Sequence, residues 1–168
     1  MTLDDIDWHL IELLQSDGRL SYSELGRRVS LSASAVTERV RRLEDRGVIT
    51  GYGASIDTTK LSLPIEAIVR ARVRSLDGPQ FRANILPVPQ IVAADHVTGD
   101  ECWLLRVLCA DTRELEELVE RVQRYGETTT SLVLSSPLRR RPIARRTGTA
   151  NSRTQTDISR TQTDISRT

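Results

Sequence analysis

The chain is poor in the residues from which catalytic and metal centres are most often built. Its 168 residues include two histidines, two cysteines and 4% aromatic residues. Two histidines cannot supply a His-rich metal site, and Cys102 and Cys109 form no CxxC pair, so we expect reduced, packed thiols. No Ser-His-Asp set, paired-carboxylate cleft or phosphate-binding glycine loop can be assembled. The sequence therefore predicts neither an enzyme nor a bound metal or cofactor.

Long apolar runs and strong charge are also missing from most of the chain. No run approaches the roughly 18–20 apolar residues that a membrane span needs, and the acidic N-terminus does not resemble a signal peptide. We therefore expect a cytoplasmic protein with no membrane partner. The net charge is −2 over residues 1–50, −3 over residues 51–137 and +6 over residues 138–168. Any nucleic-acid contact in the acidic body must therefore come from local arginine clusters.

Three helices are predicted within the first fifty residues. Asp4, Ser21 and Ser32 each precede an amphipathic stretch and are expected to cap it. The short connection between the second and third helices predicts a helix-turn-helix spanning about residues 22–41. The following sequence, GVITGYGASID, is expected to be extended, as a wing or an outgoing strand. The predicted helices cover residues 4–16, 22–29 and 33–46.

The third predicted helix has an apolar face and a polar face. Short hydroxyls near its N-terminus can meet phosphates or base edges, and its arginines offer planar donors for phosphate or guanine. The alternative is a solvated face on which Glu38 and Arg42 form an ordinary ion pair one turn apart. The capped helix and short turn before it favour DNA binding. The candidate DNA-binding residues are Ser32, Ser34, Thr37, Glu38, Arg39, Arg41 and Arg42.

Residues 61–137 predict an α+β domain with the order β-α-β-β-α-β, the ferredoxin-like arrangement. Alternation of apolar residues and arginines marks its first strand. After this domain, residues 152–165 hold two copies of SRTQTDI. These repeats cannot build an apolar seam and are expected to be disordered. The predicted strands are residues 65–75, 90–97, 102–110 and 128–136, and the predicted helices are residues 77–86 and 111–126.

The sequence TGDE, residues 98–101, connects the two middle strands. A glycine there can free backbone N–H groups to hold a carboxylate, and Asp100 or Glu101 could meet an ammonium group. The loop could therefore grip both ends of an amino acid. The alternative is a hairpin turn with solvated acidic residues, which composition alone favours. The candidate effector-binding residues are Thr98, Gly99, Asp100 and Glu101.

The chain resembles the Lrp/AsnC (feast/famine) transcription regulators. Residues 3–52, LDDIDWHLIELLQSDGRLSYSELGRRVSLSASAVTERVRRLEDRGVITGY, resemble their DNA-binding half. The sequence HVTGDECWLLRV, followed by TSLVLS and an RPI tripeptide, resembles their effector-binding RAM half. The family usually has an acidic residue before the aromatic residue of the TG loop, and Cys102 stands there in this chain.

This resemblance implies a winged helix-turn-helix over residues 1–50, a linker strand over residues 51–60 and a RAM domain over residues 61–141, before a disordered tail at residues 142–168. It also implies double-stranded DNA as partner, a homodimer that assembles further, as far as an octamer, and an amino acid bound between subunits. Sirohaem decarboxylase subunits resemble the family in both halves, so an enzyme of that kind is the alternative. Its tetrapyrrole site needs histidine and arginine groups, and the second half holds one histidine, His96.

Overall fold

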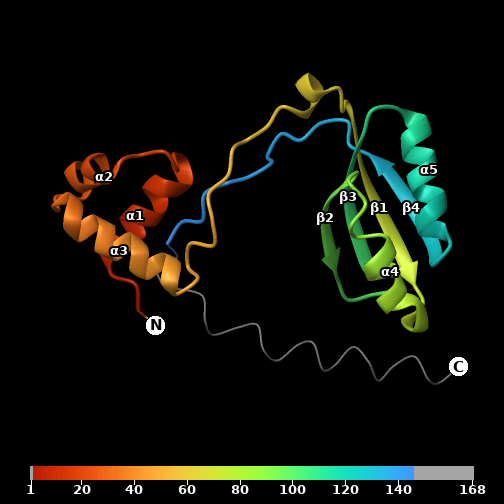
Figure 1. Ribbon diagram of the computed structural model, residues 1–168, viewed down its shortest axis with the longest axis horizontal. Helices are drawn as coiled ribbons and strands as arrows, with labels where there is room; N and C mark the ends of the chain where they lie inside the picture. The colour runs from red at the N-terminus through yellow and green to blue at the C-terminus, as the bar shows by residue number, and fades with distance from the viewer. Residues whose placement is uncertain (1, 146–168) are drawn as a thin grey trace, which may run out of the picture. The chain divides into compact units, whose positions relative to one another are not determined.

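The computed structural model describes residues 2–145, which form two units (Figure 1). The helical unit runs to Gly53 and includes the returning segment from Arg140. The sheet unit spans Ala54–Arg139. Most of the predicted tail, with the SRTQTDI repeats, lies outside the described residues.

The helical unit contains the three predicted helices, α1 (Asp5–Ser16), α2 (Tyr22–Val29) and α3 (Ala33–Asp45). The three predicted caps are confirmed, because the side chains of Asp4, Ser21 and Ser32 each accept a hydrogen bond from a backbone N–H of the first helical turn, at 2.8–3.2 Å. Such a cap satisfies a donor that the helix leaves unpaired. The helices enclose a small core of Leu10, Leu25, Val29, Val36 and Val40.

The turn between α2 and α3 depends on a glycine. A Cβ on Gly26 would lie 2.5 Å from the carbonyl oxygen of Leu31, so a larger residue would push the turn away from α2. Ser30 ends α2 in the left-handed conformation with φ of 57°. The chain can therefore reverse within three residues and bring α3 across α2, as the predicted helix-turn-helix requires.

The predicted wing and linker strand are absent from the described chain. Residues 48–57 form no strand, and residues Thr58–Leu61 form a short 3₁₀ helix. A strand needs a neighbouring strand to satisfy its backbone groups, and none lies beside residues 51–60. The prediction of a linker strand over residues 51–60 is therefore wrong for the described chain.

The sheet unit confirms the α+β, ferredoxin-like prediction. Its four strands are antiparallel in the order β2-β3-β1-β4. The last strand begins at Gly126, two residues before the prediction, because its pairing with β1 extends to Val73 opposite Gly126. A Cβ at Gly126 would collide with the carbonyl oxygen of Arg72, so this close approach requires glycine. The elements are β1 (Ile65–Val73), α4 (Gly78–Asn84), β2 (Ile91–His96), β3 (Trp103–Cys109), α5 (Thr112–Gln123) and β4 (Gly126–Leu132).

The two faces of the sheet differ. Helices α4 and α5 pack on one face, where Phe81 of α4 and Val122 of α5 meet the buried side chains of β1 and β3. The other face carries no helix from residues 2–145, and apolar and charged residues alternate on it across strands: Ile68 pairs with Arg106, and Leu104 pairs with Arg70. We call this second surface the open sheet face.

Candidate DNA interface and effector site

The polar side of α3 is exposed as predicted, but its seven candidate residues do not have equal freedom. Ser34, Thr37, Glu38 and Arg41 are exposed to solvent. The Thr37 hydroxyl donates to the carbonyl of Ala33 at 2.8 Å, so it is already oriented along the helix. No ion pair involves Arg41 or Glu38 within the described residues. These two side chains are therefore free to reach a ligand.

Arg39 and Arg42 instead bind acidic residues of α1. The Arg39 guanidinium donates to Asp4 at 2.6 Å and to Asp7 at 2.8 Å, and Arg42 lies 3.4 Å from the same Asp7 oxygen. The Asp7 side chain is 6% exposed. We call this group, Asp4, Asp7, Arg39 and Arg42, the N-terminal clamp. It fastens the start of α1 to the middle of α3.

The electrostatics of the N-terminal clamp favour its charged state. The backbone N–H of Asp7 and the Arg39 guanidinium donate to Asp4 and lower its pKa. The hydrogen bonds that Arg39 donates to Asp4 and, to a smaller extent, to Asp7 raise the pKa of Arg39. An arginine that is held in this way by two carboxylates is not available to a phosphate without breaking those bonds.

The TGDE loop has the predicted backbone conformation but an unexpected partner. Gly99 has φ of +106°, which a residue with a Cβ rarely adopts. Asp100 forms an ion pair with Arg72 at 2.9 Å, and Glu101 accepts from Thr129 at 2.7 Å. We call these residues, with Arg70 at 3.5 Å from Glu101, the loop cluster. Both acidic side chains are thereby engaged by strand residues, as the sequence did not indicate.

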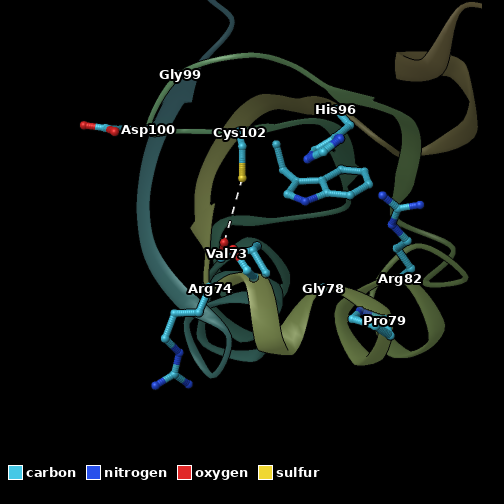
Figure 2. A pocket seen from close by; sticks show the side chains of 11 residues that line it. Val73, Arg74, Gly78, Pro79, Arg82, His96, Gly99, Asp100 and Cys102 are labelled. Atoms are coloured by element: carbon cyan, nitrogen blue, oxygen red, sulfur yellow. Dashed lines mark hydrogen bonds between the residues drawn. The ribbon is translucent and has the colours of Figure 1, made fainter.

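A cavity of about 670 Å³ lies next to the loop and extends to α4. Trp103, the first residue of β3, lines this cavity together with His96 and Arg82, which are labelled in Figure 2. The rings of His96 and Trp103 lie 4.6 Å apart, and the Arg82 guanidinium carbon lies 5.3 Å from the Trp103 ring. The sequence indicates no role for Arg82. Its position one helical turn after Pro79 places it on the same side of α4, but this spacing does not indicate a function.

Cys102 occupies the rim of the cavity, where the family usually has an acidic residue. Its half-buried thiol donates weakly to the carbonyls of Ala71 and Val73, both at 3.9 Å. Cys109 lies in the core, and burial raises its pKa to about 11. Both cysteines are free, as predicted.

The described residues hold neither a metal-binding cluster nor a membrane-spanning helix. Across residues 2–145 there is no group of three or more His, Cys, Asp or Glu side chains placed to hold a metal ion. None of the helices in this part of the chain combines the length and apolar character needed to cross a bilayer.

The helix-turn-helix and the ferredoxin-like sheet together define a two-domain DNA-binding protein with a regulatory domain. An AsnC-type helix-turn-helix model matches residues 3–44, and an Lrp/AsnC ligand-binding domain model matches residues 66–143. The chain belongs to the Lrp/AsnC family of transcriptional regulators.

Individual relatives agree with this assignment. The regulator LrpC of Bacillus subtilis is 38% identical over 135 residues, which cover 80% of this chain and 94% of LrpC. The solved structure of B. subtilis LrpC matches with a TM-score of 0.78 and 36% identity, covering 83% of this chain and all of that one. A feast or famine regulatory protein of Mycobacterium tuberculosis, complexed with L-methionine, matches with a TM-score of 0.77 and 34% identity, covering 84% and 100%. None of these names indicates an enzyme, so the sirohaem decarboxylase alternative gains no support.

Proposed function

We propose that this regulator reads double-stranded DNA with the exposed part of the α3 surface and has no enzymatic activity. The observation that carries the proposal is the division of the α3 arginines: Arg39 and Arg42 bind α1, while Arg41 is free. A guanidinium without an ion-pair partner on α3, the second helix of the helix-turn-helix, can enter the major groove and contact guanine or phosphate. Ser34, Thr37 and Glu38 lie on the same exposed side, whereas Ser32 mainly caps the helix.

The test is to map the DNA fragments that the purified full chain retains from fragmented chromosomal DNA. A sequence-specific reader enriches a few sites over bulk DNA, and Arg41→Ala reduces that enrichment. Uniform retention of all fragments, or an unchanged pattern for Arg41→Ala, would reject α3 as the reading element. The relatives named above come from bacteria, whose DNA lies in the cytoplasm, and this supports a cytoplasmic location for the protein.

Self-association is the second part of the proposal. Two sites on DNA are read best by a symmetric dimer, whose reading helices are separated by about 34 Å, one helical turn. The open sheet face supports a homodimer, because Leu104 and Leu108 are only half-buried there and charged residues lie opposite them. Assembly of dimers up to an octamer is the family's larger form. Sedimentation at several concentrations measures the assembly, and Leu104→Arg should lower its mass.

The third part of the proposal is an amino-acid effector held by the loop Thr98–Glu101. Backbone N–H groups near Gly99 suit a carboxylate, and Asp100 can exchange its exposed pair with Arg72 for a ligand ammonium. Effector binding would favour one arrangement of the assembly over another and thereby change DNA affinity. Repeating the DNA mapping with a panel of amino acids tests this coupling directly.

A further inference from the structure

We propose that the cavity beside the TGDE loop selects an effector amino acid with an acidic side chain. This inference rests on the proposed effector function and names the class of amino acid. The loop would hold the two α-groups of the ligand, and the cavity would receive its side chain. The cavity is suited in size, because small-molecule sites in proteins measure about 300–1,000 Å³, compared with about 670 Å³ here.

The charged groups around the cavity are mainly cationic. Arg74 and Arg82 line it, and Asp100 is the only carboxylate among the lining residues. Asp100 pairs with Arg72 at the loop end of the cavity, and in Figure 2 its carboxylate points away from His96 and Arg82. Cys102 replaces the family's acidic residue and contributes no charge in its thiol form. A ligand side chain that enters the cavity therefore meets no free carboxylate.

The two arginines differ in their availability. Arg74 donates to Asp77 at 2.6 Å, and Figure 2 shows its side chain directed away from His96 and Arg82. Arg82 lies against the Trp103 ring and forms no ion pair within the described residues. A guanidinium that packs against an aromatic ring keeps its N–H edge for a carboxylate, which it can bind with two parallel hydrogen bonds. Arg82 is therefore the group that would recognise the ligand.

Two neighbours prepare Arg82 for this role. The Trp103 side chain is fixed in the core, with the whole residue 6% exposed and its ring 5.2 Å from Phe81. Because Arg82 packs against a fixed ring, less of its conformational freedom is lost on binding. His96 packs against the same ring at a tilt of 32° and offers a second N–H donor to the cavity that it also lines.

The experiment compares ligands that differ in charge but hardly in shape. L-Glutamate and L-glutamine, and L-aspartate and L-asparagine, are titrated calorimetrically into the full chain. We expect each acid to bind at least tenfold more tightly than its amide, because one charge-assisted hydrogen bond pair separates them. Arg82→Gln should remove this ratio. The matched control is Arg74→Gln, which should keep it, because Arg74 is already paired.

The outcomes separate this inference from the proposed effector function. Equal or tighter binding of the amides overturns the acidic class while leaving the effector site in place. An unchanged ratio in Arg82→Gln overturns Arg82 as the group that recognises the ligand side chain. Failure of every amino acid to bind at millimolar concentration overturns both the acidic class and the effector site. The DNA-reading role is measured without ligand, so it is unaffected by either result.

Discussion

The N-terminal clamp and the loop cluster both pair carboxylates with arginines, but they do so in different surroundings. In the N-terminal clamp the central acid, Asp7, has a side chain that is 6% exposed, and it joins two helices. In the loop cluster the Asp100 side chain is 86% exposed, and its partner Arg72 is 52% exposed. Breaking a buried pair leaves an uncompensated charge, whereas an exposed pair contributes little.

This difference separates structural charges from exchangeable ones. The N-terminal clamp fixes α3 relative to α1, and so it determines where Arg41 points. The loop cluster can open at little cost, because water replaces the lost contacts, and a ligand ammonium can take the place of Arg72. Residues with the same chemistry therefore serve to position the reading helix in one unit and to receive a ligand in the other.

The largest expected effect is at the centre of the N-terminal clamp. Asp7→Ala leaves Arg39 with one carboxylate and Arg42 with none, so we expect the helical unit to lose about 2–3 kcal/mol of its free energy of unfolding. Urea unfolding followed by Trp8 fluorescence in a Trp103→Phe background measures this unit alone. Asp45→Ala is the control, since Asp45 is exposed and forms no ion pair among the described residues. Equal effects of the two changes would show that the clamp is not structural.

The second prediction distinguishes the α3 arginines by their role on DNA. Arg41→Ala should weaken specific binding by about 1–3 kcal/mol without changing the stability of the helical unit. If Arg41 contacts a phosphate, the magnitude of the slope of log binding constant against log salt concentration also falls by about 0.9. Arg39→Ala should lower both stability and affinity but leave the slope unchanged. Gel-shift titrations at several salt concentrations measure both quantities, and unchanged affinity for Arg41→Ala would contradict its assignment.

The sequence predicted the elements better than it predicted the partners of charged residues. Caps and apolar periodicity are local signals. The three helices of the helical unit and the order of strands and helices in the sheet unit could therefore be predicted. Arg39 and Asp7 lie 32 positions apart, and no local pattern shows that two helices bring them together. The linker strand failed for the same reason, since a strand depends on a distant partner. The role of Arg82 likewise depends on Trp103, which is remote in sequence.

The third prediction concerns the exposed side of the comparison. Asp100→Asn should change the free energy of unfolding of the sheet unit by less than about 1 kcal/mol, because the pair with Arg72 is exposed. Affinity for an amino-acid effector should nevertheless fall by roughly tenfold or more, since a charge-assisted hydrogen bond is lost. Calorimetric titration measures the effector affinity. Urea unfolding followed by Trp103 fluorescence in a Trp8→Phe background measures the free energy of unfolding. DNA affinity without ligand should not change. If Asp100→Asn binds the effector with unchanged affinity, Asp100 does not contribute to effector binding.

The smallest expected effect is a pH dependence of the sheet unit that arises from Glu66. Burial raises the pKa of this β1 residue, but the hydrogen bonds from Arg139 and Arg106 outweigh it, and the pKa lies below the ordinary value of 4.5. Arg139, 2.7 Å away, belongs to the segment that follows β4. Because the unfolded chain takes up the proton first, the contacts of Glu66 with Arg139 and Arg106 stabilise the fold above pH 4.5. That contribution is lost as the pH falls through the lowered pKa.

Glu66→Gln provides the comparison that isolates this contribution. The stability difference between the natural chain and Glu66→Gln should be constant from pH 7 to about pH 5, and it should shrink as the pH falls further. Urea midpoints from Trp103 fluorescence in the Trp8→Phe background measure it. Arg139→Gln should reduce the same pH dependence in part, because Arg106 remains. A difference that persists unchanged at pH 3 would mean that Glu66 acts through packing and not through its charge.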